Sequence, residues 1–362
     1  MLNKLCLPLI VCLITLFLFS CGTETSEPTE QTVFLSENGV TIMCPDSQVG
    51  DVGVVDGVEY EVVDMNRLIQ RRIMEADLSK VCVSNITDMS GMFQNSQFNQ
   101  PIGNWDVSNV TNMSRMFENT PFNQPISEWN VSSVTDMEGM FYESQFNQPI
   151  ENWDVSSVTV MSLMFFDSPF NKPIGNWDVS SVIVMGGMFG TYQNQQPSPF
   201  NKPIGNWDVS SVMDMGGMFA NSQFNQPIGD WDVSSVEYMR FMFRDSKFNH
   251  PIGNWDVSSA IDMGGIFQRS QFNQLIGEWD VSSVTNMFRM FEDSQFNQPI
   301  GDWDVSSVTE VRDMNAMFRR SKFNQDISSW CVSNISFEPQ YFSEDSPLTE
   351  ENKPVWGTCP SN

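Results

Sequence analysis

The sequence repeats one group that could take part in chemistry, an aspartate placed directly after a tryptophan. Ten copies of a phrase close to FNQPIGNWDVSSVTDM lie between Phe98 and Trp330. If successive copies stack about 4.8 Å apart, their carboxylates line up as like charges. Each carboxylate must then accept N–H bonds within its own turn, or share a cation with its neighbours. The residues concerned are Asp106, Asp154, Asp178, Asp208, Asp232, Asp256, Asp280 and Asp304.

One substitution favours the structural role over a calcium site. Asn130 takes the place of the aspartate in one copy, and its neutral amide keeps the same acceptor geometry without the charge. We therefore predict carboxylates that cap turns, and no cofactor. Calcium bound along the row of aspartates is the less favoured alternative.

The rest of the sequence offers little to an enzyme. His250 is the only histidine, and it replaces the Gln of the repeated Phe-Asn-Gln, so we interpret it as a variant of the repeat. The sequence holds no His/Cys cluster with metal-ligand spacing, no phosphate-binding loop and no Ser nucleophile elbow. We predict that the protein is not an enzyme. A solenoid polysaccharide lyase or hydrolase is the least favoured alternative.

The spacing of the tryptophans defines the elements that must position these residues. From Trp105 to Trp177, and again from Trp207 to Trp303, the step is 24 residues. Two other steps are longer, with insertions in Gly190–Pro199 and near Glu310. A period in the twenties predicts a solenoid whose coils bury their apolar sides against one another. Insertions that leave the repeat intact belong in surface loops.

Each coil is predicted to be an α/β unit with one short helix and one short strand. Val110, Met113, Met116 and Phe117 share a helical face, and paired glycines such as Gly186-Gly187 limit that helix to a turn or two. Phe-Asn-Gln-Pro-Ile fits a very short strand, and Gly-Asn-Trp-Asp fits a turn. The repeated Phe, Ile, Trp, Val and Met side chains form the predicted inner layer. The Asn after Phe should hydrogen-bond from coil to coil.

Cysteines mark both ends of the repeats. Cys82 and Cys331 stand in the same phrase, where Asp usually follows Trp, and Cys44 and Cys359 lie in the flanking segments. Four cysteines in an exported chain suggest two disulfides. About nine coil steps would place Cys82 and Cys331 about 40 Å apart, too far for a bond. We therefore predict the pairs Cys44–Cys82 and Cys331–Cys359, each closing a cap onto its end coil.

The segment before the repeats has the pattern of a small β-rich cap. Asn38-Gly39 and Asp56-Gly57 each lie between two strand-like runs, which is typical of tight hairpins. The stretch from Asp64 to Asp77 is predicted to be helical, with Met65, Leu68, Ile69 and Ile73 on one side. Such a cap would cover the first coil.

The N-terminus has the pattern of an export signal. A lysine precedes the apolar run Leu5–Phe19, which is too short for a comfortable membrane span. Cys21 follows Leu-Phe-Ser, similar to the lipobox of bacterial lipoproteins, in which the cysteine is acylated; Phe19 departs from the small residue usual there. An uncleaved anchor and an ordinary signal peptide are the alternatives. The predicted divisions are a signal peptide (1–20), a lipidated polar tether (21–32), an N-terminal cap (33–80), the solenoid (81–335) and a C-terminal cap (336–362).

The charge of the chain restricts its partners. The formal net charge of −27 at pH 7 argues against binding to nucleic acid and to anionic lipid. We expect membrane contact only through the N-terminal lipid. The expected location is the cell surface or the outer membrane.

Taken together, these motifs are similar to those of the BspA-like leucine-rich-repeat surface proteins of bacteria. The resemblance rests on VTDMSGMF and FNQPIGNWDVSSVT, on ENGVTIMCPDSQVGD before the repeats and on NKPVWGTCP after them. It covers nearly the whole mature chain and implies leucine-rich-repeat-like coils. It also implies a surface lipoprotein or secreted protein that binds host or matrix proteins or other cells, without catalytic residues. We expect the partner to be an extracellular protein or glycan of the matrix or a cell surface. A passive spacer is the main alternative function.

Binding should be sought where the copies differ. Two windows vary most: the pair of residues between the two Met positions, and the residues just after Met-Phe. Nine of the 18 Lys and Arg residues lie between Arg240 and Lys322. Arginine beside an exposed aromatic ring is typical of binding surfaces, although a solvated face is the alternative. The candidate binding residues are Arg240, Phe241, Arg244, Arg269, Phe288, Arg289, Arg319 and Arg320.

We predict that Cys21→Ala releases the protein from the membrane fraction or leaves an uncleaved precursor, because the acylated thiol would be lost. Fractionation and metabolic labelling with a fatty acid measure the effect. A Cys21→Ala protein that is cleaved, labelled and membrane-bound like the wild type would contradict the assignment of Cys21 as the lipidation site.

Overall fold

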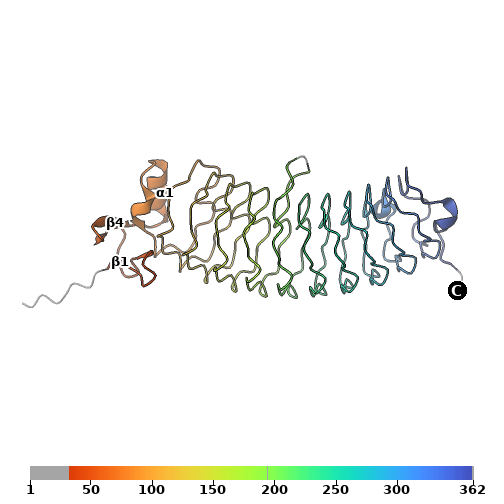
Figure 1. The fold of residues 1–362 in the computed structure, drawn as a ribbon, viewed down its shortest axis with the longest axis horizontal. Coiled ribbons are helices and arrows are strands. Elements are labelled where there is room, and N and C mark those ends of the chain that lie inside the picture. The colour runs from red at the N-terminus through yellow and green to blue at the C-terminus, as the bar shows by residue number, and fades with distance from the viewer. Residues whose placement is uncertain (1–31, 194, 361–362) are drawn as a thin grey trace, which may run out of the picture. The chain divides into compact units, whose positions relative to one another are not determined.

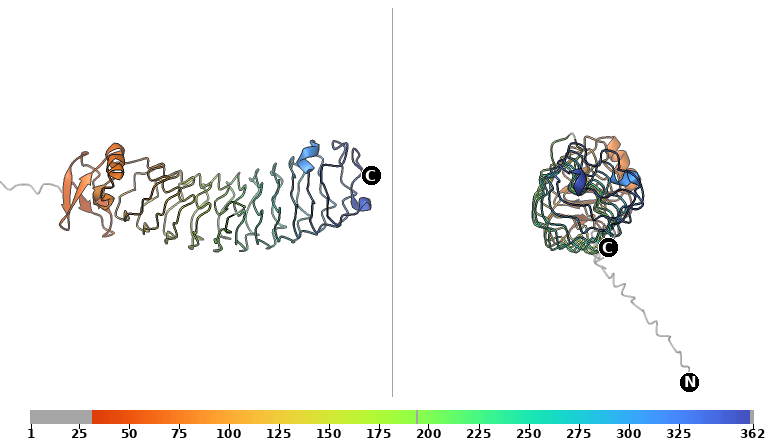
Figure 2. Two further views of the ribbon diagram at one scale, coloured as in Figure 1. Left: turned by 90° about the horizontal axis from the view of Figure 1, so that it is seen from above. Right: turned by 90° about the vertical axis from the view of Figure 1, so that its right-hand side faces the viewer.

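Coils of about 24 residues stack side by side along one axis, and their outlines superpose when viewed along it (Figure 1, Figure 2). The computed structural model describes residues 32–193 and 195–360, and Thr32–Asn362 forms one unit. The predicted signal peptide, the lipidation site Cys21 and nearly all of the tether lie outside the described residues. Within the described part of the chain, no helix is long and apolar enough to cross a membrane.

A small β-rich cap precedes the first coil, as predicted from the hairpin motifs. Its two hairpins turn at Gly39 and at Asp56-Gly57, which have positive φ. Strand β5 (Val81–Cys82) pairs in parallel with β4 (Val58–Val62) and leads directly into the first coil. Asp64 caps the helix α1 (Met65–Ile73), which is shorter than the sequence suggested. The elements are β1 (Phe34–Leu35), β2 (Ile42–Met43), β3 (Val52–Val55), β4 (Val58–Val62), α1 (Met65–Ile73), η1 (Leu78–Lys80) and β5 (Val81–Cys82).

In one segment of each coil, alternate backbone N–H groups donate to carbonyls of the next coil. In the second coil, the N–H groups of Met113, Arg115, Phe117 and Asn119 donate to carbonyls of the third coil at distances of 2.7–2.9 Å. The equivalent four bonds recur from coil to coil along the stack. Every second peptide N–H in this segment therefore points toward the C-terminal end of the stack.

The short helix predicted in each coil is wrong. Arg115 and Asn119 have φ of 56° and 51°, and equivalent residues with positive φ recur in the other coils. A right-handed helix requires N–H bonds to the carbonyl four residues earlier, whereas these N–H groups reach the neighbouring coil. The segment is a series of turns, and α1 in the cap is the one α-helix among residues 32–193 and 195–360.

The strand predicted for Phe-Asn-Gln-Pro-Ile is also wrong. Isolated parallel bridges instead join the residue before the first Met of each coil, as between Asn112 and Asp136. At Phe-Asn-Gln the asparagine side chain replaces a strand partner. Asn123 Oδ1 accepts the backbone N–H of Asn147 at 2.9 Å and the side chain of Gln148 at 3.0 Å. The coil-to-coil role predicted for the asparagine is confirmed.

The predicted inner layer is confirmed. The recurring Phe, Ile, Trp, Val and Met side chains of the coils are buried. Their rings form two stacked columns, with centroids 5.6 Å apart for Phe117 and Phe141 and 6.2 Å apart for Phe122 and Phe146. The Nε1–H of each repeated Trp from Trp129 to Trp330 donates to a carbonyl of the preceding coil, as Trp129 does to Ile102 at 3.1 Å. Burying the indole therefore leaves no unmet donor.

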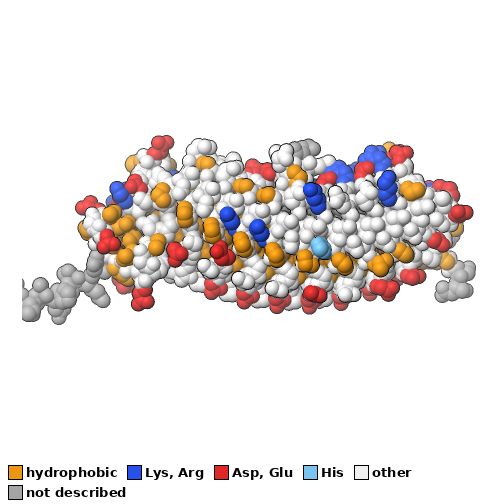
Figure 3. Space-filling model, in the orientation of Figure 1, with side chains coloured by type: hydrophobic (Ala, Val, Ile, Leu, Met, Phe, Trp, Pro, Cys, Tyr) orange, Lys and Arg blue, Asp and Glu red, His pale blue; other side chains and the backbone are white. Residues whose placement is uncertain are grey.

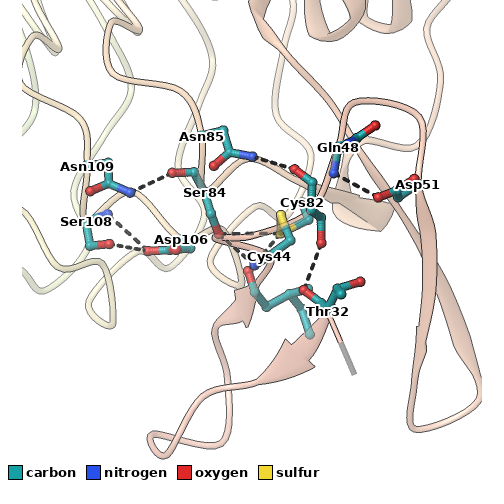
Figure 4. The surroundings of a disulfide bond; sticks show 12 residues. Thr32, Cys44, Gln48, Asp51, Cys82, Ser84, Asn85, Asp106, Ser108 and Asn109 are labelled. Atoms are coloured by element: carbon teal, nitrogen blue, oxygen red, sulfur yellow. Dashed lines mark hydrogen bonds between the residues drawn. A yellow bond between two sulfur atoms is a disulfide. The ribbon is translucent and has the colours of Figure 1, made fainter. Parts of the chain in front are cut away.

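Two disulfides close the ends of the stack. Cys44 bonds to Cys82, and Cys331 bonds to Cys359, which are the pairs expected from the sequence. Figure 4 shows that Ser84 lies beside the first bond, where its hydroxyl accepts the N–H of Cys44 at 2.9 Å. The cap is thereby tied to the first coil.

The two insertions lie outside the repeated core. The loop around Gly190–Pro199 stands out from the row of coils in Figure 1. The second insertion contains the 3₁₀ helix η2 (Val311–Met314), and a third 3₁₀ helix, η3 (Glu350–Asn352), belongs to the C-terminal segment.

Replacing Asn123 with Ala should lower the free energy of unfolding by about 1–3 kcal/mol, because the half-buried N–H of Asn147 would lose its acceptor. Thermal and urea unfolding measure the loss. Asn254→Ala, at an exposed turn, is the matched control and should change stability by no more than about 0.5 kcal/mol. Equal losses in both variants would contradict a stabilising asparagine ladder.

Candidate binding groove

The repeated aspartates accept hydrogen bonds within their own turns. Asp154 Oδ1 accepts the N–H of Ser156 at 3.1 Å and its hydroxyl at 2.6 Å. Asn130 makes the same two bonds to Ser132. The equivalent bond from the serine N–H is made at Asp106, Asp178, Asp208, Asp232, Asp256, Asp280 and Asp304. No group of three or more His, Cys, Asp or Glu that could hold a metal occurs in the described part of the chain.

These turns favour the ionised carboxylate. Hydrogen bonds from Ser234, first from its hydroxyl and then from its backbone N–H, lower the pKa of Asp232. Asp178, Asp256 and Asp280 have lowered pKa values for the same reason. The carboxylate of Asp256, one coil away, opposes the effect at Asp232.

His250 occupies a place in the repeated contacts. Its Nε2 lies 3.0 Å from the carbonyl oxygen of Asn225. Gln124 donates from its Nε2 to the equivalent carbonyl, that of Asn99, at 3.2 Å. The histidine therefore substitutes for the amide of the usual Gln.

The two variable windows lie on one face of the stack, which we call the variable face. A column of left-handed residues runs along it, formed by the second residue between the two Met positions of each coil. In this column a large side chain is usually followed by a small one. The column is Gly91, Arg115, Gly139, Leu163, Gly187, Gly217, Phe241, Gly265, Arg289, Ala316 and Tyr341.

The alternation follows from close packing between coils. A Cβ on Gly265 would lie 2.3 Å from Phe241, and one on Gly187 would lie 2.6 Å from Leu163. Each large side chain therefore lies over the small residue of the next coil, and a second large residue there would clash unless the first moved.

The alternation breaks where Gly217 follows Gly187. No large side chain from the preceding coil covers Gly217, and a Cβ added there would meet only Ala220, at 4.0 Å. Gly217 is accordingly half-buried, whereas Gly139, Gly187 and Gly265 are buried. A groove of about 590 Å³ occupies the vacant place.

The walls of the groove come from coils on either side of this break. Leu163 and Phe166 line it toward the N-terminal end, and Phe241 and Arg244 line it toward the C-terminal end. Phe166 packs between two tyrosines, stacked on Tyr142 at 5.4 Å and edge-on to Tyr192 at 5.0 Å. Aromatic side chains thus stand over a floor of glycines.

The insertion supports the N-terminal wall. Tyr192, from the inserted loop, is hydrogen-bonded through its hydroxyl to that of Tyr142, and it donates to Glu143 at 3.1 Å. Burial, together with the bond to Tyr192, raises the pKa of Tyr142 well above its usual value. The loop and the coil surface therefore form one joined wall.

The arginines predicted to bind fall into two groups. Arg269 is paired with Asp245 through two bonds of 2.6 Å, and Arg320 is paired with Asp293 through bonds of 2.8 and 2.6 Å. Arg319 donates to Glu344 at 2.7 Å. These three guanidinium groups are already engaged within the chain.

The other arginines stack on phenylalanine rings. Arg240 and Arg244 lie over Phe241 at 4.7 and 4.9 Å, and Arg289 lies over Phe288 at 4.8 Å. The Nε atoms of Arg244 and Arg289 are buried without a hydrogen-bond partner. The nearest carboxylate to Arg244, that of Asp245, is 3.6 Å away.

The groove brings together some of the binding residues predicted from the sequence, together with others that were not predicted. Arg240, Phe241 and Arg244 line it, whereas the other candidate binding residues lie further along the variable face. Figure 3 shows basic side chains gathered over the C-terminal coils and acidic ones along the opposite edge. Sequence reasoning missed Leu163 and Gly217; the broken alternation of large and small residues was the signal.

Comparison with known families identifies the chain as a repeat protein. The family described as "Mycoplasma protein of unknown function, DUF285" matches residues 63–169, 122–196, 144–246, 168–271 and 246–356. These overlapping matches cover most of the sequence, so the chain belongs to this family. Comparisons with curated proteins and with solved structures found no match.

Lowering the pH should destabilise the protein through the turn carboxylates. A carboxylate whose pKa is lowered by folding contributes stability above its unfolded pKa of about 3.9, and that stability is lost as the pH falls through the folded pKa. The melting temperature should therefore fall between about pH 4 and pH 2. The variant Asp178→Asn/Asp232→Asn/Asp256→Asn/Asp280→Asn should show a smaller fall, since Asn130 makes the same bonds uncharged.

The same variant separates turn capping from calcium binding. If the aspartates only cap turns, a chelator should leave the melting temperature of the wild type unchanged at neutral pH. A drop of many degrees that calcium reverses, and that is absent in the variant, would show that calcium binds there.

Proposed function

We propose that this chain is a surface-displayed, non-catalytic binding scaffold that acts as an adhesin or protein–protein interaction module. In this proposal the stacked coils are a leucine-rich-repeat-like solenoid, exported and lipid-anchored through Cys21. The solenoid holds a binding face away from the membrane. The resemblance to BspA-like surface proteins and the polar tether after Cys21 support this arrangement.

The groove at Gly217 is the observation that carries the proposal. The repeated positions are occupied by packing and by coil-to-coil hydrogen bonds, so they are not free to recognise a partner. The groove instead combines a volume of about 590 Å³, aromatic walls and two arginines that lie over Phe241. Concave sites lined by aromatic residues and a few charged groups are typical of binding sites.

A passive spacer is the second candidate, because a repeated core alone would suffice for it. A spacer has no need for an exposed cation stacked on an aromatic ring beside a concave site, whereas such groups are typical of binding surfaces. Arg240 is exposed, lies 4.7 Å from the ring centroid of Phe241 and lines the groove. This arrangement favours a binding role.

A binding screen of the delipidated mature chain against matrix proteins, cell-surface proteins and glycans should identify a partner. Arg240→Glu/Arg289→Glu should then weaken binding by about 30-fold, as expected for hot-spot residues worth about 2 kcal/mol. Arg289 lies 3.5 Å from the buried carboxylate of Glu292, so the double variant should lose some stability. Arg240→Glu alone, at an exposed position on the groove, should leave the melting temperature nearly unchanged and still weaken binding.

Lys247→Glu/Arg312→Glu is the matched control, with the same change in net charge at exposed positions. It should retain most of the affinity at moderate salt. An equal loss in both double variants would indicate only long-range electrostatic attraction. The absence of any partner in a broad screen would favour the spacer.

A further inference from the structure

The vacancy over Gly217 has the setting that a large side chain fills at other coils of the column. At two other steps of the column, one coil fills the equivalent place over the next with Leu163 and with Phe241. Among the later coils of the column, Gly217 is the one small residue that is not preceded by a large one, because the preceding coil has Gly187 at this position. The first coil's Gly91 is uncovered simply because no coil precedes it.

The polar groups that line the groove are mostly engaged within the chain. Asp214 accepts the N–H of Gly216 at 2.7 Å, Asp262 accepts that of Gly264 at 2.8 Å, and Thr191 donates to Asp167 at 2.6 Å. A sugar ring requires several free donors and acceptors around its hydroxyl groups, whereas a side chain like Leu or Phe requires only the apolar walls. The chemistry of the lining therefore favours a peptide.

The arginines indicate a second property of the bound molecule, a negative charge near its apolar side chain. Arg240 and Arg244 come from one coil, and both lie over the ring of Phe241. The N–H of Gly217 donates to the carbonyl of Arg240 at 2.8 Å, so the vacancy and these cations are on adjacent coils. A carboxylate close in sequence to the apolar side chain could reach the guanidinium groups, with which it would form charge-assisted hydrogen bonds.

We propose that the groove binds an acidic peptide segment of an extracellular protein. An apolar side chain of the segment lies over Gly217, between Leu163 and Phe241. An aspartate or glutamate within a few residues of it pairs with Arg240 and Arg244. This assignment rests on the proposed binding function and names the chemistry of its partner.

A random dodecapeptide phage library panned on the mature chain tests this proposal. The enriched peptides should contain Phe, Leu, Ile, Tyr or Trp within about four residues of Asp or Glu. A synthetic peptide of the consensus sequence should bind the wild type. Changing its acid to the amide, or its apolar residue to Gly, should each weaken binding by about tenfold or more.

Gly217→Leu fills the vacancy and should abolish binding of the synthetic peptide. The variant should fold, because Leu163 has the same positive φ in the same column and Gly217 faces open space. Gly91→Leu introduces the same residue at the equivalent backbone position far from the groove, and it should bind like the wild type. Equal melting temperatures of the two variants show that any loss is local.

The outcomes separate this proposal from the binding function itself. A library that yields no acidic consensus, or a peptide whose binding survives Gly217→Leu, overturns the peptide groove. A protein or glycan partner that binds Gly217→Leu like the wild type leaves the binding function in place at another site. A uronic-acid oligosaccharide that binds the wild type and not Gly217→Leu would make the groove a glycan site and overturn the peptide assignment.

Discussion

The structure depends on backbone hydrogen bonds that run from each coil to the next. Four N–H groups of one coil reach carbonyls of its neighbour, and the left-handed residues in each coil orient the peptides for these bonds. A left-handed residue with a side chain costs free energy, which the bonded and packed neighbours must offset. Because the column of such residues is continuous, the size of one side chain constrains the next. The groove at Gly217 is a consequence of this constraint.

These four N–H groups all point toward the C-terminal end of the stack, which explains why both ends require caps. The N–H of Thr135 and its equivalents donate the opposite way, as Thr135 does to Thr111 at 2.8 Å. At the N-terminal end the first coil presents carbonyl groups, and the guanidinium of Arg72, from α1, donates to that of Met92. At the other end, Ala316, Phe318 and Arg320 donate to carbonyls of residues 340–344. A cation is suited to a row of aligned carbonyls, as at the C-terminus of a helix. The caps thus satisfy the polar edges as well as covering the core.

The sequence predicts the architecture well where side chains repeat, and poorly where the backbone decides. The 24-residue period, the buried layer and the role of the asparagines follow from side-chain chemistry that recurs at fixed places. The helix was wrongly predicted because the spacing of Val110, Met113 and Phe117 also fits a series of tight turns. Nothing in the residue types of Arg115 or Phe241 indicates a positive φ; only the glycines in equivalent coils do. The binding windows could be found because their residues vary between copies. The groove could not, because finding it requires knowing that the side chain of one coil lies over the left-handed residue of the next.

Two departures from the repeat, the glycine at position 187 and the inserted loop, occur in the same coil. Their proximity is relevant to function. Gly187 leaves Gly217 uncovered, and the insertion that begins a few residues later supplies Tyr192, which packs against Phe166 in the wall of the same groove. Asn221, four residues after Gly217, holds the loop by donating to the carbonyl of Tyr192 at 2.7 Å. A surface loop that was merely tolerated would not need hydrogen bonds to the coil that contains Gly217. This loop does make such bonds, so the uncovered Gly217 and the wall supported by the loop form a single groove. Both parts of the groove arise where the chain departs from the repeat, whose regular positions serve packing.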